Sequence, residues 1–264
     1  MAKYSGRLAN PPIVYAFCQI RFPPVGTIDE AKANEIHASL REQYPHRVAQ
    51  NIVEMPFVTG IGNPTPTLRQ AWFLYDRPKS SGFVLEPTTF AYRTTAYVDF
   101  EHFVTEAVKG LKQTLEILRP TLIDRVGLRF IDLIEGTDTA GLDSYIEAPL
   151  LGYKPHIDGF QPQLNQQMVM GKTTSGNIVF RYSRAQHPIA VPPELMDPTL
   201  TGLKKPKPDT ESVIVDIDHF KDNADLDPNL ELLEKLIRDL QGPMSTLFKD
   251  AVTSFACGEW NKKQ

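Results

Sequence analysis

Hydrophobic residues follow two different spacings along the chain, and these spacings divide it into strands and helices. Runs rich in β-branched and aromatic residues, bounded by proline or glycine, are typical of β-strands. Such runs predict strands over residues 13–22, 48–57, 70–75, 82–86, 90–100, 125–135, 168–170, 178–182 and 213–217. Apolar residues three or four positions apart predict helices over residues 27–44, 104–118 and 230–252, with a shorter helix at 142–151.

The order of these elements indicates an α+β fold. Strands come in consecutive groups with helices after them, which favours a largely antiparallel, curved sheet over a doubly wound parallel one. We expect the two long helices to pack on one face of this sheet. The second face would then need water, a ligand or a partner. Pro243 interrupts the last helix, but the apolar stripe continues beyond it, which predicts a kink and not a break.

A six-residue pattern occurs twice and indicates an internal duplication. Residues 98–103 read VDFEHF and residues 215–220 read VDIDHF, and each follows a strand-like run and precedes helical spacing. Residues 79–84 also resemble residues 173–178. The sequence therefore predicts an N-terminal half over residues 1–140 and a C-terminal half over residues 141–264, related by a pseudo-twofold axis. The second half would carry an exposed, proline-rich loop at about residues 188–210.

Composition limits the classes of function. With 264 residues, 41% hydrophobic and 23% charged, the chain has the composition of an ordinary globular protein. A formal net charge of −4 disfavours broad binding to nucleic acid. Cys18 and Cys257 are the only cysteines, which is typical of a reducing compartment. Neither a signal peptide nor a membrane span is recognisable, so we expect a cytoplasmic protein that does not associate with membranes.

Two groups of acidic and histidine residues are candidates for metal or acid–base chemistry. They are Asp99 with His102 and Asp216 with His219, and their oxygen and nitrogen atoms suit several divalent metals. If they faced each other, the chain would be a metal-dependent or nucleotide-directed enzyme. We favour the alternative that the carboxylates cap the starts of helices. Because no known catalytic signature is present, we expect no cofactor and no enzymatic activity.

Two arginines lie inside apolar strands and form a second candidate site. A guanidinium at Arg21 or Arg129 must reach either solvent or a carboxylate, and Asp132 is a candidate partner. Together these residues are a candidate site for an anionic ligand or a protein segment. The favoured alternative is an internal salt bridge or a solvated face. Three lysines at positions 204, 205 and 207 leave nucleic-acid binding as a weaker alternative to a solvated loop.

Three short segments resemble a sporadically distributed, uncharacterised family of prokaryotic proteins of about this length. They are NPPIV at residues 10–14 leading to IRF at 20–22, RVGLRFI at 125–131, and the ending from Leu247 to Trp260. The resemblance spans nearly the whole chain and implies no activity. Its patchy distribution implies an accessory gene of the kind found in defence or toxin–antitoxin loci.

These observations lead to one expectation about function. We expect a non-enzymatic binding protein that is one component of a multi-gene bacterial system. It would hold a protein partner on the open face or edge of the sheet. The partner would be a product of the same operon or a second copy of the chain, as a homodimer.

Overall fold

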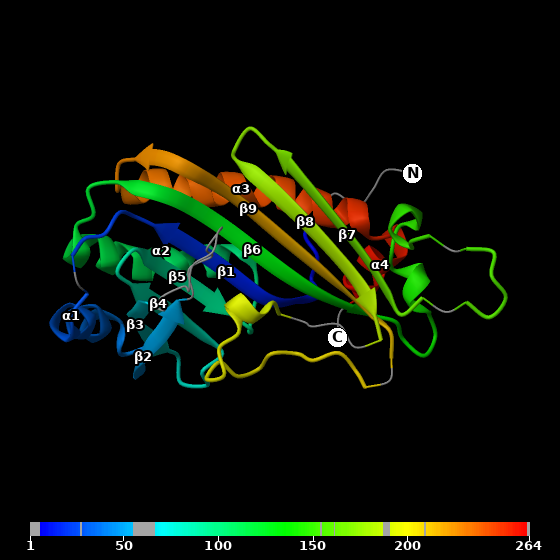
Figure 1. Cartoon of the computed structure of the whole chain (residues 1–264), viewed down its shortest axis with the longest axis horizontal. Coiled ribbons are helices and arrows are strands. Elements are labelled where there is room, and N and C mark those ends of the chain that lie inside the picture. The colour runs from blue at the N-terminus through cyan, green and yellow to red at the C-terminus, as the bar shows by residue number, and fades with distance from the viewer. Residues whose placement is uncertain are drawn as a thin grey trace, which may run out of the picture.

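The computed structural model describes residues 6–26, 28–54, 67–153, 155–160, 162–186, 191–208 and 210–262. Within them one open sheet has the strand order β2-β3-β4-β5-β1-β6-β9-β8-β7, and all neighbouring strands are antiparallel (Figure 1). The strands are β1 (Ile13–Arg21), β2 (His46–Glu54), β3 (Thr67–Tyr75), β4 (Ser81–Glu86), β5 (Thr89–Thr94), β6 (Ile123–Glu135), β7 (Leu164–Lys172), β8 (Asn177–Ala185) and β9 (Ser212–Leu226).

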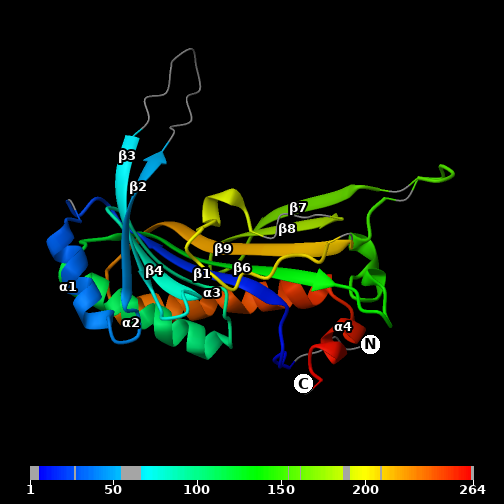
Figure 2. The same cartoon turned by 90° about the horizontal axis from the view of Figure 1, so that it is seen from below.

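The helices confirm the predicted α+β architecture. They are α1 (Glu30–Leu40), α2 (Phe100–Leu118), α3 (Leu230–Ala251) and α4 (Ser254–Glu259). The two long helices, α2 and α3, lie side by side against one face of the sheet (Figure 2). α3 continues through Pro243 without ending there, as the continuing apolar stripe predicts. The predicted helix at 142–151 is instead two 3₁₀ turns, Leu142–Ser144 and Ala148–Leu150.

The main core lies between the sheet and these helices. Alternate residues of the strands, such as Cys18 of β1, Leu128 of β6 and Val215 of β9, face the helices and are buried. Gly110 lets α2 approach the sheet closely, because a Cβ atom there would lie 2.3 Å from the ring of Phe83. Within the described residues, no helix has both the length and the apolar character needed to cross a lipid bilayer.

Many described residues of the proline-rich stretch are exposed, as its composition predicts, but part of the stretch also covers the sheet. Residues 191–203, which we call the strap, cross the sheet face opposite α2 and α3 (Figure 2). Val191 is buried against Val14 and Ile131, and Leu200 packs against the apolar side chains of β3, β4 and β5. The strap therefore shields part of the second face. Residues 188–190 and 209 of the predicted loop lie outside the described residues.

The internal duplication is not confirmed. Residues 98–103 contain the start of α2, whereas residues 215–220 lie inside β9, which continues to Leu226. The two six-residue patterns therefore have different backbone conformations and different neighbours. The strands are arranged similarly on the two sides of the central β1–β6 pair. Next to β1 the order is β5, β4, β3, and next to β6 it is β9, β8, β7. This likeness concerns topology alone, and both proposed halves contribute to a single sheet.

Candidate functional site

A row of ion pairs lies on the sheet face opposite the helices. Arg129 on β6 donates two hydrogen bonds to Asp216 on β9, Nε to Oδ1 at 2.8 Å and one terminal nitrogen to Oδ2 at 2.7 Å. Its other terminal nitrogen reaches Glu194 of the strap at 3.1 Å. Arg181 on β8 contacts the same Asp216 carboxylate at 3.4 Å. Arg129 is therefore part of an internal salt bridge, the alternative that the sequence favours.

The row of ion pairs continues toward the end of β1, the start of β6 and the end of β9. Arg125 contacts Asp222 at 2.8 Å and Asp218 at 3.7 Å, and its guanidinium lies 3.7 Å from the centre of the Phe220 ring. Arg21 is half exposed and reaches Asp222 at 3.4 Å. Burial raises the pKa of Asp218, although Arg125 and Arg129 act in the opposite direction. The structure thus brings Arg21 and Arg129 to one face, but each has a carboxylate partner within the chain.

The strap and the sheet enclose a cavity of about 400 Å³ beside these charges. Phe17, Gln19 and Glu86 contribute to its wall, together with Arg129 and Asp218. Arg93 of β5 and Asp197 of the strap form a buried ion pair at its side, and the Tyr75 hydroxyl also donates to Asp197. The sequence analysis did not find Arg93 or Asp197, because no local pattern connects residues so far apart in the chain.

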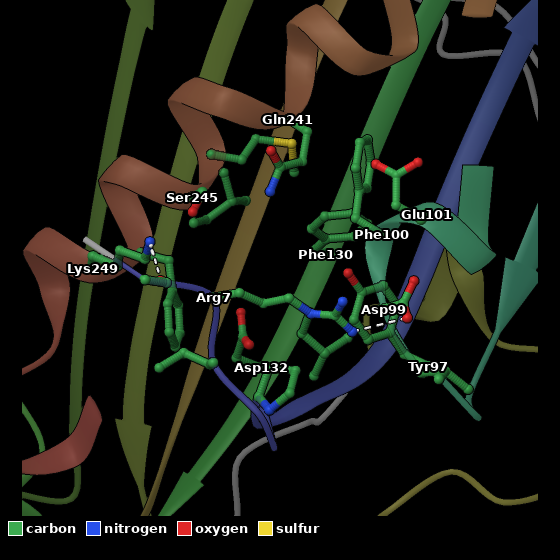
Figure 3. A pocket seen from close by; sticks show the side chains of 18 residues that line it. Arg7, Tyr97, Asp99, Phe100, Glu101, Phe130, Asp132, Gln241, Ser245 and Lys249 are labelled. Atoms are coloured by element: carbon green, nitrogen blue, oxygen red, sulfur yellow. Dashed lines mark hydrogen bonds and ion pairs between the residues drawn. The ribbon is translucent and has the colours of Figure 1, made fainter. Parts of the chain in front are cut away.

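Asp132 does not accompany the arginines, contrary to the prediction that it is their partner. It lies on the helix side of β6, where it lines a different cavity (Figure 3). Arg129 and Asp132 are three positions apart, and an odd spacing in a strand places two side chains on opposite faces. The structure therefore separates Asp132 from the candidate site to which the sequence assigned it.

Asp99 and His102 lie at the start of α2. The Asp99 side chain accepts a hydrogen bond of 2.7 Å from the backbone N–H of His102, and Arg7 reaches its other oxygen at 2.9 Å. This backbone bond is the main reason that the pKa of Asp99 is lowered. Asp99 is thus the helix cap that the sequence favours, while the His102 side chain is exposed.

Asp216 and His219 lie within β9 and point to opposite faces of the sheet. His219 is fully buried on the helix side. Its Nδ1 donates to the Leu240 carbonyl of α3 at 2.6 Å, so that Nε2 accepts from the Thr173 hydroxyl at 2.8 Å. Burial lowers the pKa of this imidazole. In the part of the chain that the structure describes, no three metal-ligating side chains come together.

The β7 edge of the sheet exposes apolar side chains. Leu164, Met168, Val169 and Met170 are 56%, 64%, 60% and 69% exposed. Met168 is paired with Arg181 and Met170 with Val179, so both methionines face the same side as the ion pairs. A groove of about 630 Å³ lies next to them, between β7, β8, β9 and Pro192. The sequence predicts β7 as a hairpin strand, but it does not reveal that the strand is an edge.

No family model matches the sequence, and a search of curated proteins finds no match.

Proposed function

We propose that this chain is a non-enzymatic binding protein that holds a protein partner along the β7 edge and the adjoining sheet face. The observation that carries the proposal is the exposed apolar row of β7. The partner would extend the sheet by one strand, a common mode of peptide recognition.

An unprotected edge strand normally attracts other strands. Its unpaired N–H and C=O groups form a template, and proteins usually block this template with charges, prolines or bulges. Residues 164–171 of β7 contain no charged residue and no proline. The opposite edge differs, because Arg47 of β2 lies over the Trp72 ring at 4.9 Å and pairs with Glu30 at 3.2 Å. Of the two edges, β7 is therefore the one suited to a partner.

The groove beside β7 supplies space for the partner's side chains. Its wall combines apolar groups of Leu164, Met168 and Ile214 with the charged groups of Arg181 and Asp216. Methionine is flexible and polarisable, and it adapts to varied apolar surfaces. An extended segment with alternating apolar and polar side chains would match an edge of this composition.

The biological setting is part of the same proposal. The family resemblance supports a role as one component of a multi-gene accessory system, whose other product would be the partner. A second copy of the chain is the competing occupant of the β7 edge, since two such edges can pair around a twofold axis.

The test is purification of the tagged protein from its own host, followed by native mass measurement. We expect one stoichiometric partner, which the double variant Met168→Lys/Met170→Lys loses because the lysines place charge in the apolar contact. Leu232→Lys is the matched control, since Leu232 is an exposed apolar residue on α3. It should retain the partner.

Two results would decide against this proposal. If the double variant and the control bind the same partner equally well, binding does not involve β7. If the wild-type protein is a monomer with no bound protein, there is no partner. A homodimer that the double variant dissociates would identify the second copy as the occupant.

A further inference from the structure

A cavity of about 340 Å³ lies on the helix side of the sheet, against β6 and not against β7. It is bounded by β6, by α3, by the start of α2 and by residues 6–13. Figure 3 shows the Asp132 carboxylate among the lining side chains, with Gln241 and Ser245 of α3 across from it. The volume falls in the range of small-molecule sites.

Among the described residues, Asp132 is buried in this cavity without a hydrogen-bonding or ion-pair partner. It is 3% exposed, and within the described residues it makes no hydrogen bond or ion pair. Buried carboxyl groups in proteins are almost always paired or hydrogen-bonded. A carboxyl that lines a cavity and has no partner among the described residues can accept one from a ligand.

The other charged groups around the cavity are already engaged. Arg7 pairs with Asp99 at 2.9 Å, Glu101 pairs with Arg238 of α3 at 2.8 Å, and Lys249 donates to the Gly6 carbonyl at 2.8 Å. None of these groups neutralises Asp132. A positive group that enters the cavity would therefore find one acidic partner at its base.

Aromatic rings form the wall next to Asp132. The rings of Tyr97 and Phe130 have centroids 5.7 Å apart, and those of Phe100 and Phe130 are 6.4 Å apart at an interplanar angle of 76°. Aromatic faces attract organic cations, and a carboxylate beside such rings is a common way to recognise an ammonium group. Gln241 and Ser245 add polar groups that can accept hydrogen bonds from the same ligand.

We propose that this cavity binds a small organic ammonium ion, which pairs with Asp132 and rests its apolar body against Phe100 and Phe130. An ammonium group of this kind occurs on free amines and on the lysine side chains of peptides, and both present the same chemistry to Asp132. The inference is independent of the partner at β7, because the two sites lie on different parts of the sheet.

The first experiment uses benzylamine as the cationic probe and benzyl alcohol as its neutral counterpart. Binding is followed by calorimetry on the full chain. We expect benzylamine to bind, benzyl alcohol to bind much more weakly, and Asp132→Asn to lower the affinity for benzylamine by about tenfold or more. Asp138→Asn is the control, since Asp138 is exposed and does not line this cavity. It should leave the affinity unchanged.

The second experiment distinguishes the two sources of the ammonium group. A Gly-Lys-Gly peptide with an acetylated N-terminus and an amidated C-terminus is compared with the same blocked peptide carrying acetyl-lysine, which lacks the charge. Binding of the lysine peptide alone identifies a peptide ligand, and binding of benzylamine alone identifies a free amine. If neither cation binds, or if Asp132→Asn binds as well as the wild type, the proposal is wrong. Phe130→Leu gives an independent check, because it should weaken benzylamine binding without altering Asp132.

Discussion

Arg93 on β5 and Asp197 in the strap form an ion pair whose side chains are only 6% and 4% exposed. The Arg93 guanidinium also lies over the Phe73 ring at 5.1 Å, and the Tyr75 hydroxyl donates to Asp197. These contacts join the strap to the middle of the sheet. The strap therefore depends on a charge interaction that is shielded from water.

Replacement of Asp197 with alanine should destabilise the fold markedly. The change leaves the Arg93 charge buried without its partner, and the loss of one member of a buried ion pair typically costs about 3–5 kcal/mol. Urea unfolding measures the effect. Glu194→Ala is the matched control from the same strap, because Glu194 is largely exposed and should cost less than about 1 kcal/mol. Equal losses in the two variants would show that the Arg93–Asp197 pair does not hold the strap.

Replacement of Asp132 with asparagine should stabilise the protein at neutral pH. Burial raises the pKa of the Asp132 carboxyl well above its ordinary value, and the nearby charge of Asp216 adds to this effect. The native state therefore holds the proton more tightly than the unfolded state, and stability is lost as the pH rises from the ordinary carboxyl pKa of about 4 toward the native pKa.

Asparagine removes this cost, and we expect a gain of about 1–3 kcal/mol at pH 8. The gain should shrink as the pH falls from the native pKa toward about 4, the ordinary pKa of the carboxyl, because the unfolded chain then holds the proton as well. Urea unfolding at several pH values measures the difference. Asp138→Asn, at an exposed position, should show no such trend. A variant less stable than the wild type at pH 8 would contradict the assignment.

His219 should make the stability depend on pH in the opposite direction. Burial lowers its native pKa below the value of 6.5 that is ordinary for histidine, so the unfolded chain binds the proton more readily. Stability is then fully present above about pH 6.5 and falls as the pH decreases toward the native pKa. His219→Gln removes this titration, and its stability should change less between pH 7.5 and 5.5. His102→Gln, at an exposed histidine, should keep the wild-type slope.

The hydrophobic pattern predicts most of the fold correctly. The strand at 13–22, the helix at 104–118 and the α+β class follow from local spacing, because a half-buried element must repeat its apolar residues with its own period. The predicted end of the last strand, at residue 217, is wrong, because β9 continues to Leu226. Residues 215–219 alternate between the two faces, with Val215, Ile217 and His219 on the helix side, but the likeness to residues 98–103 led to the expectation of a helix start.

The candidate site is less predictable than the fold. The pairing of Arg129 with Asp216 depends on the register of β6 against β9, and the pairing of Arg93 with Asp197 joins residues 104 positions apart. Neither relationship leaves a local pattern in the sequence. The opposite orientation of Asp132 was predictable, since its spacing from Arg129 is odd.

The strap has a consequence for how this sheet can change. It connects β8 to β9, which are immediate neighbours and could be joined by a tight hairpin turn. The connecting segment is therefore unnecessary for the strand order, and the free energy of closing a loop rises only slowly with its length. Insertions between Leu203 and Ser212, outside the strap, can remodel the surface beside the sheet while the strands and the two long helices keep their places.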